Sequence, residues 1–77
     1  MRKQITARSR AASVVAGNID RQKRMHETSY ESIANALNLS RTTLSNRMKH
    51  PETFTLAEIF TLAQFFRVDV AEIIIGG

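Results

Sequence analysis

Residues 30–45 decide the fold, and they read Tyr-Glu-Ser-Ile-Ala-Asn-Ala-Leu-Asn-Leu-Ser-Arg-Thr-Thr-Leu-Ser. The first apolar residues of this stretch recur at the spacing of one helix face: Ile33, Ala34 and Leu37. This spacing predicts a short helix that begins at Ser29 or Tyr30 and ends at Leu37. Thr28 and Glu31 have the spacing of a capping box at its start, and Ser29 is a competing cap.

A tight turn and a second short helix are expected to follow. Asn38 tolerates the left-handed backbone conformation that ends a helix, and Ser40 is a favourable N-cap for the next one. This helix is expected to run from residue 41 to about Lys49. It stops before Pro51, because a residue that precedes proline is disfavoured in helical geometry. Two short helices joined in this way, over about residues 29–49, are the layout of a helix-turn-helix unit.

The outward face of the second short helix carries polar and basic side chains but no acidic one: Arg41, Thr42, Ser45, Asn46 and Lys49. A helix of ~10 residues is about 15 Å long and fits the major groove of DNA, which is about 12 Å wide. Asn46 can bond adenine through two hydrogen bonds, and Arg41 can bond guanine. The hydroxyl groups that can contact bases or phosphates are those of Ser40, Thr42 and Ser45. The alternative is an ordinary helical hairpin whose outer face happens to be polar.

The net charge of +4 on the 77 residues is distributed unevenly. Residues 1–29 carry seven Lys or Arg against two acids, a net charge of +5, and residues 30–50 carry +2. Residues 51–77 carry −3, from one Arg against four acids. A basic front and an acidic back favour a polyanionic partner on one face, and the alternative is ordinary solvated helix surface.

The N-terminal segment also has helical periodicity. A helix is expected over about residues 7–25, with Gly17 and Asn18 as weak points and an inward stripe of Ala12, Val15 and Ile19. Residues 1–17 are basic and free of acids, as in a transit peptide or a membrane-surface helix. The apolar spacing continues through Gly17, however, so the sequence has no boundary where cleavage should fall.

The C-terminal half predicts two more helical segments. A helix over residues 55–66 has the apolar stripe Leu56, Ile59, Phe60, Ala63 and Phe66. A last apolar turn is expected over about residues 69–75, although the β-branched residues 73–75 are also compatible with an extended strand. The sequence therefore predicts an all-α class and a single five-helix domain over residues 1–77, in which residues 1–6 are a candidate flexible basic arm.

Composition and spacing argue against an enzyme or a metal protein. The chain has no cysteine, and its three glycines form no phosphate-binding loop. No apolar run approaches the ~20 residues of a membrane helix. His26 and His50 are isolated from other metal ligands, and Glu58 and Glu72 are expected to be solvated carboxylates rather than a catalytic pair. No enzymatic activity, cofactor, metal or small-molecule ligand is expected.

The stretch quoted first resembles the core of the Cro/C1-type (XRE-like) helix-turn-helix domains of phage repressors and bacterial regulators. Residues 51–68, Pro-Glu-Thr-Phe-Thr-Leu-Ala-Glu-Ile-Phe-Thr-Leu-Ala-Gln-Phe-Phe-Arg-Val, are similar to the fourth helix of that family. The resemblance covers about residues 12–74. It implies a compact, five-helix, lambda-repressor-like domain that docks its third helix in the major groove of double-stranded DNA, typically as a dimer on a two-fold operator.

The resemblance also implies roles for individual residues. Carried over by position, the base contacts come from Ser40, Arg41, Thr42, Ser45 and Asn46. Tyr30 is implied to lie against a phosphate, and Lys49 is expected to contact the DNA backbone. Two positions depart from the family pattern: Asn38 stands where glycine is usual, and Arg47 stands where an apolar residue is usual. Met48 is expected to take the apolar role, and Arg47 to reach a phosphate.

Two further surfaces are expected at the ends of the chain. The apolar residues Phe60, Phe65, Ile73, Ile74 and Ile75 either complete the core or form a homodimer surface, and the dimer is favoured because a chain this small leaves them without cover. The basic residues Arg2, Lys3, Arg8 and Arg10 are either a free tail or an arm that follows phosphates or a minor groove.

The expected function is sequence-specific DNA binding by a transcriptional regulator, a Cro-like repressor of a phage or prophage that occludes its operator in the cytoplasm of a bacterial host. A chain of this length leaves no room for a sensor domain, so control is expected through synthesis level. One alternative is an architectural or excision-type DNA-binding protein. Another is an antitoxin or antirepressor that binds a protein through Phe60 and residues 73–75.

Overall fold

The computed structural model describes residues 7–76, with side chains from Arg10 onward. Its helices are α1 (Ala7–Met25), α2 (Tyr30–Leu37), α3 (Arg41–Lys49), α4 (Leu56–Phe66) and α5 (Val70–Ile74), and a short 3-10 turn, η1 (Pro51–Thr53), connects α3 to α4. The all-α, five-helix fold is confirmed, and no strand occurs within residues 7–76. Residues 73–75, for which a strand was an alternative, lie in α5 and its C-cap.

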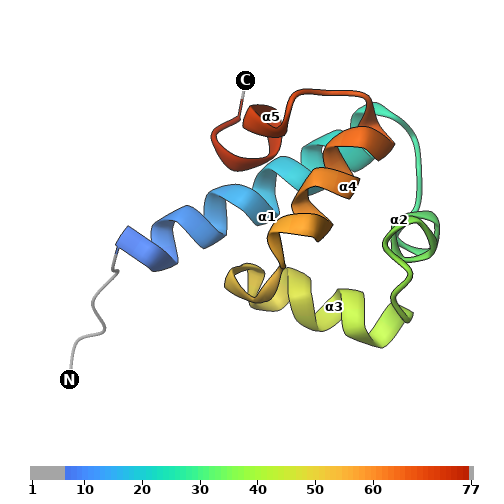
Figure 1. Ribbon diagram of the computed structural model, residues 1–77, viewed down its shortest axis with the longest axis horizontal. Coiled ribbons are helices and arrows are strands. Elements are labelled where there is room, and N and C mark those ends of the chain that lie inside the picture. The colour runs from blue at the N-terminus through green and yellow to red at the C-terminus, as the bar shows by residue number, and fades with distance from the viewer. Residues whose placement is uncertain (1–6, 77) are drawn as a thin grey trace.

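The helices are arranged around one apolar core (Figure 1). The long helix α1 packs against η1, α4 and α5, and α2 packs against α3 and α4. The most deeply buried apolar side chains come from every helix: Ile19, Ile33, Leu44, Leu62, Phe66 and Ile73. In Figure 1, α3 lies along one edge of the molecule and α5 lies along the opposite edge. The core therefore presents α3 at the surface on the side away from α5.

The caps of α2, α3 and α4 explain where these helices begin. Ser29 caps α2 by accepting a hydrogen bond from the backbone N–H of Ser32 at 3.1 Å, so the capping box predicted from Thr28 is wrong. Thr28 instead belongs to the turn that ends α1, where its N–H donates to the Lys23 carbonyl. Ser40 caps α3 as predicted. The reciprocal capping box occurs at α4, where it lies between Thr55 and Glu58.

The turn between α2 and α3 has the predicted backbone. Asn38 has φ +60° and ψ +39°, in the left-handed region, and its N–H closes α2 on the carbonyls of Ala34 and Asn35. Leu39 is half-buried against the core. Only three residues, 38–40, therefore separate α2 from α3.

The apolar stripe of α4 is rotated relative to the prediction. Ile59, Ala63 and Phe66 are buried, but Leu56 is 64% exposed and Phe60 is 49% exposed. Leu62, which the predicted stripe omitted, is fully buried. Residues such as Leu62 and Phe60 flank the same central stripe on opposite sides. Contacts with α2 and α5 select one side, and helical spacing alone does not distinguish them.

Helix α1 runs without a break through the two residues predicted to weaken it. Asn18 is buried, and its Nδ2 donates to the carbonyl oxygen of Ile73 at 3.0 Å, which joins α1 to α5. Gly76, at φ +93°, lies so close to this amide that a Cβ would come within 2.9 Å of the Asn18 Oδ1. Asn18 is therefore a tertiary contact rather than a local defect of the helix.

Gly17 offers a stabilising substitution. It is exposed in the interior of α1, and a Cβ built there meets no atom within 4 Å. Replacing Gly17 by alanine is expected to raise the free energy of unfolding by about 0.5–1 kcal/mol, because alanine loses less backbone entropy in a helix. Urea unfolding followed by circular dichroism measures this gain. A loss of stability would contradict the open space around this residue.

Candidate nucleic-acid interface

The outer face of α3 is a continuous polar surface. The side chains predicted to contact bases or phosphates from this helix are all exposed: Arg41, Thr42, Ser45, Asn46 and Lys49. Within residues 10–76, no hydrogen bond or ion pair of the chain itself engages any of these five side chains. Their donors and acceptors are therefore available to another molecule. No acidic residue lies anywhere in α3.

Ser40 lies at the start of this surface and has a structural task. Its hydroxyl accepts a hydrogen bond from the Thr43 N–H at 3.0 Å and donates to the Thr43 hydroxyl at 2.9 Å. These two bonds begin α3 and fix its first turn. Ser40 is exposed as predicted, but its hydroxyl differs from those of Thr42 and Ser45 in being used by the helix itself.

Tyr30 lies beside α3 and is held by α1. Its hydroxyl donates to the Asp20 Oδ1 at 2.8 Å, and the Lys23 ammonium lies 4.7 Å from the centre of its ring. Asp20 also faces Arg24, at 3.5 Å. Burial and the hydrogen bond to Asp20 raise the pKa of the Tyr30 hydroxyl above its ordinary value. The sequence predicted that this hydroxyl contacts a phosphate, but in the structure it donates to an internal acceptor, Asp20. The cation beside the ring is Lys23.

A shallow pocket of about 230 Å³ joins Tyr30 to α3. Its apolar lining comes from Tyr30, Leu44 and Met48, and its polar lining comes from Arg41, Ser45 and Lys49. No carboxylate lines it. The structure therefore brings together, around one depression, four residues that the sequence predicted to contact DNA from two different helices.

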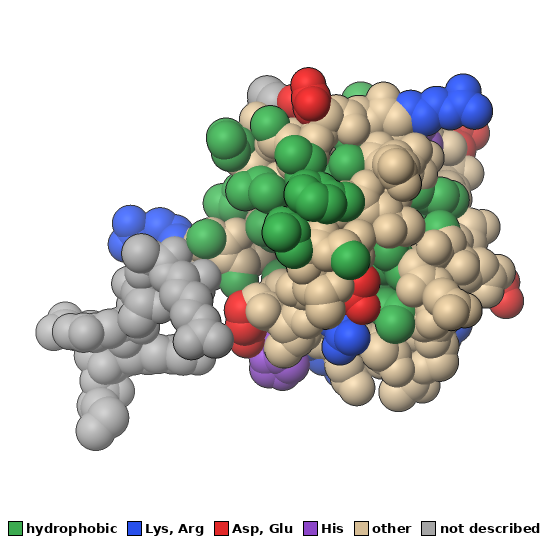
Figure 2. Space-filling view, viewed as in Figure 1, with side chains coloured by type: hydrophobic (Ala, Val, Ile, Leu, Met, Phe, Trp, Pro, Cys, Tyr) green, Lys and Arg blue, Asp and Glu red, His purple; other side chains and the backbone are tan. Residues whose placement is uncertain are grey.

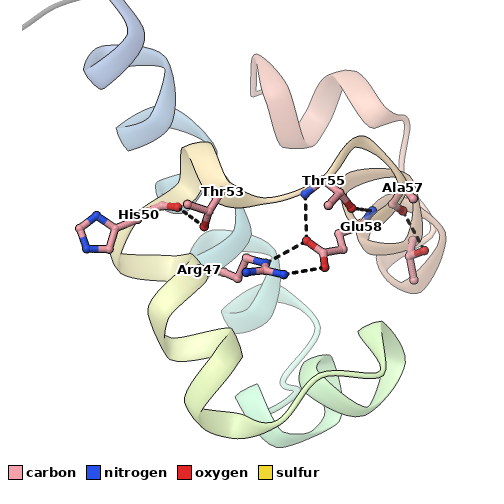
Figure 3. A network of polar contacts seen from close by, with 7 residues as sticks. Arg47, His50, Thr53, Thr55, Ala57 and Glu58 are labelled. Carbon is pink, nitrogen blue, oxygen red and sulfur yellow. Dashed lines mark hydrogen bonds and ion pairs between the residues drawn. The ribbon is translucent and has the colours of Figure 1, made fainter.

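Arg47 does not share this exposed face. It reaches from α3 toward Glu58 of α4 (Figure 3), with Nε 3.0 Å from Oε1 and Nη2 3.2 Å from Oε2. The two side chains are 25% and 14% exposed. The phosphate role predicted for Arg47 therefore competes with a two-bond ion pair inside the molecule. The prediction of a solvated Glu58 is wrong, because helix α3 covers this carboxylate.

The charge state of Glu58 is set by this network. Its Oε1 also accepts a hydrogen bond from the Thr55 N–H at 2.9 Å. Burial by itself raises the pKa of Glu58, but the hydrogen bonds from Arg47 and Thr55 outweigh burial, and this pKa lies below its ordinary value. The Thr-x-x-Glu spacing before an apolar run signals the capping box in the sequence. Nothing in the spacing signals the partner on α3.

Comparisons with protein-family models, with curated proteins and with solved structures give no match.

The apolar residues predicted at a dimer surface divide into two groups. Ile73 is fully buried in the core, so the prediction that it lies at a dimer surface is wrong. Phe65 is half-buried, with its ring edge-on to that of Phe66. Ile73 is buried because α5 turns this side chain toward α1 and α4. The others are exposed and, together with Leu56, form what we term the apolar surface: Leu56, Phe60, Ile74 and Ile75. Figure 2 shows hydrophobic side chains gathered over α4 and α5.

The remaining predicted residues lie outside these surfaces. Arg2 and Lys3 lie outside the described residues, as does the side chain of Arg8, while Arg10 is exposed on α1. His26 stacks on Phe66 with ring centres 5.4 Å apart, and no group of three potential metal ligands occurs within the described part of the chain. Within residues 7–76, no helix is long and apolar enough to cross a membrane.

Proposed function

We propose that this chain is a sequence-specific double-stranded DNA-binding regulator of transcription that represses by occluding its operator. The observation that carries the proposal is the outer face of α3, which is exposed, free of acids and not engaged by other groups within residues 10–76. It follows α2 after a three-residue turn, and the resemblance to Cro/C1-type domains supports the same assignment. The proposed place of action is bacterial or phage DNA in the host cytoplasm.

In the proposed complex, α3 lies in the major groove and basic side chains neutralise phosphates at its edges. Asn46 and Arg41 read base edges, because an amide pairs with adenine and a guanidinium pairs with guanine through two hydrogen bonds each. Thr42 and Ser45 add shorter contacts. Lys49 contacts the DNA backbone. Lys23 does the same, and its ammonium lies over the ring of Tyr30, which lines the pocket. Arg47 supports the interface through its ion pair with Glu58 of α4 instead of contacting a phosphate.

Selection of bound sequences from a pool of random duplexes tests the proposal. A dimer with one α3 per half-site is expected to enrich two inverted half-sites about 34 Å apart. Enrichment of a single half-site still supports readout of the major groove, but it contradicts binding as a dimer. Binding without any sequence enrichment contradicts sequence-specific regulation, and strong bending of the probe in that case favours an architectural protein.

Asn46→Ala tests base readout by α3. Loss of the two hydrogen bonds to one adenine is expected to weaken binding to the selected duplex by about 1–3 kcal/mol and to relax the preference at one base pair. Titrations with the selected duplex and with a random duplex measure both effects. An equal loss on both duplexes contradicts base readout by Asn46.

Lys49→Ala is the matched contrast on the same helix. Removal of one phosphate contact is expected to weaken binding to both duplexes alike and to reduce the slope of log affinity against log salt by about one. An unchanged slope places Lys49 away from the DNA backbone.

The apolar surface supports a second candidate, a protein partner in place of or in addition to DNA. It exposes four large hydrophobic side chains on α4, on α5 and at the C-cap of α5. A second copy of the chain is the occupant that fits the two-fold operator, and a toxin or repressor protein is the occupant in the antitoxin or antirepressor reading. Salt-insensitive, sequence-independent DNA binding together with a stable protein complex favours the second reading.

A further inference from the structure

The attachment of α3 to the rest of the molecule is asymmetric. The helix packs on α2 and η1 through Leu44, which is buried, and Met48, which is half-buried. Within residues 10–76, one side-chain hydrogen-bonded link joins α3 to another helix, and it is the ion pair between Arg47 and Glu58. The apolar contacts hold the helix against the core, and this ion pair holds it from the side that faces α4 (Figure 3).

The geometry of the ion pair restricts rotation. Two N–H groups of one planar guanidinium meet two oxygens of one carboxylate, which fixes the plane of Arg47 as well as its distance. The carboxylate is itself held by the capping box, in which Glu58 and Thr55 each accept a backbone N–H from the other. The orientation of the first turn of α4 is therefore transmitted to the last turn of α3.

Rotation of α3 about its own axis decides where its outer side chains point. Successive residues of a helix are related by a fixed angle, so fixing Arg47 fixes the directions of Asn46 and Ser45 just before it and of Thr42, one turn before Asn46. Readout of bases requires side chains held within about 0.5 Å of their productive geometry. Contacts with phosphates by long, flexible lysine side chains tolerate much larger displacements.

We propose that Arg47 and Glu58 are positioning residues of the DNA interface, and that their ion pair sets the rotation of α3 needed to discriminate between base sequences. This inference rests on the proposed DNA-binding function and deepens it. Its energetic basis is that a covered ion pair contributes little net stability compared with apolar side chains of similar size, while it does specify one geometry. Replacement of both members by apolar side chains should therefore change discrimination more than stability, whereas removal of one member leaves the other charge unpaired and also loosens α3.

Glu58→Gln is the central test, because glutamine keeps the capping box but removes the charge. Affinity for the selected duplex is expected to fall about tenfold, which equals about 1.4 kcal/mol, while affinity for a random duplex changes less than about twofold. Arg47→Met keeps the aliphatic bulk and removes the planar fork, and it is expected to give the same pattern. Glu52→Gln is the matched control, since this carboxylate lies in η1, and its ion-pair partner within residues 10–76 is His50, at 3.8 Å.

Several outcomes would overturn the inference. If a variant loses equal affinity for both duplexes, the ion pair contributes only general electrostatic attraction to DNA. If Arg47→Met keeps full discrimination between the duplexes, packing of this side chain, and not the ion pair, positions α3. No change in either affinity for Glu58→Gln also overturns it.

Amide exchange separates failure of this inference from failure of the DNA-binding proposal. Glu58→Gln is expected to accelerate exchange of the Leu44 and Met48 amides at least about tenfold and to leave Ile33 of α2 unchanged. This readout needs no DNA, so it tests the positioning role even if the wild-type chain prefers no duplex. Unchanged exchange in α3 shows that the ion pair does not hold the helix, and it overturns the inference whatever the chain binds.

Discussion

Phe66→Ala is expected to lower the free energy of unfolding by about 3–5 kcal/mol, the usual cost of truncating a buried phenylalanine. The ring is almost completely buried, and it contacts the rings of His26 and Phe65 at centre distances of 5.4 Å and 5.2 Å. These contacts connect the end of α4 to the end of α1. A domain of this size has only roughly 5 kcal/mol of stability, so the variant is expected to keep no more than about 2 kcal/mol near room temperature.

Urea unfolding followed by far-UV circular dichroism measures this loss. Phe60→Ala is the matched control, because it removes the same ring from the exposed side of the same helix. That control is expected to change stability by less than about 1 kcal/mol. If the two variants were destabilised equally, the observed rotation of the α4 stripe would be incorrect.

Ile73→Asp is expected to unfold the domain. Its side chain is fully buried in the apolar core, where α5 packs against α1 and α4, so a carboxylate placed there is surrounded by apolar side chains. Burial of an unpaired charge costs several kcal/mol, which is comparable to the whole stability of the chain.

Ile75→Asp is the contrasting variant two residues later. Ile75 is 74% exposed, so this charge remains solvated and the fold is expected to be retained within about 0.5 kcal/mol. Thermal unfolding separates the two variants, and sedimentation of Ile75→Asp then tests the apolar surface. A wild-type dimer that becomes a monomer supports a second copy on this surface, whereas a wild-type monomer removes that occupant. A folded Ile73→Asp variant would contradict the burial of Ile73.

The fold could be predicted most accurately where local chemistry marks a helix end. The left-handed turn at Asn38 and the stop at Pro51 act within one or two residues, and the bounds of α2 and α3 agree with them. The prediction failed where two local signals compete. Thr28 and Ser29 both have cap chemistry, and the turn that closes α1 decides between them by using the Thr28 backbone.

The choice of buried face in α4 and α5 could not be predicted in the same way. Both helices have more apolar residues than one stripe requires, so periodicity allows Leu62 or Phe60, and Ile73 or Ile75, to face inward. The contacts of α4 with α2 and α5, and those of α5 with α1 and α4, select one of each pair. Those contacts join residues far apart in the sequence, as in the hydrogen bond from Asn18 to Ile73.

The candidate interface was predictable for the residues that follow from helix geometry alone. Once Leu44 is placed inward, Asn46 and Lys49 must face out, and the structure agrees. The partners of Tyr30 and Arg47 were not predictable, because Asp20 and Glu58 lie on other helices and their approach depends on the complete packing. The revised roles of these two residues come from tertiary structure.

Tyr30 also determines the intrinsic fluorescence of the chain. It is the single tyrosine of a chain that has no tryptophan, so the intrinsic fluorescence above that of phenylalanine arises from one phenol ring. That ring lies in the wall of the pocket beside α3, with its hydroxyl on Asp20 and Lys23 over its face. Any ligand that draws Lys23 away or displaces the hydroxyl changes the surroundings of that one emitter. The chain therefore carries its own unlabelled reporter at the surface where docking is proposed.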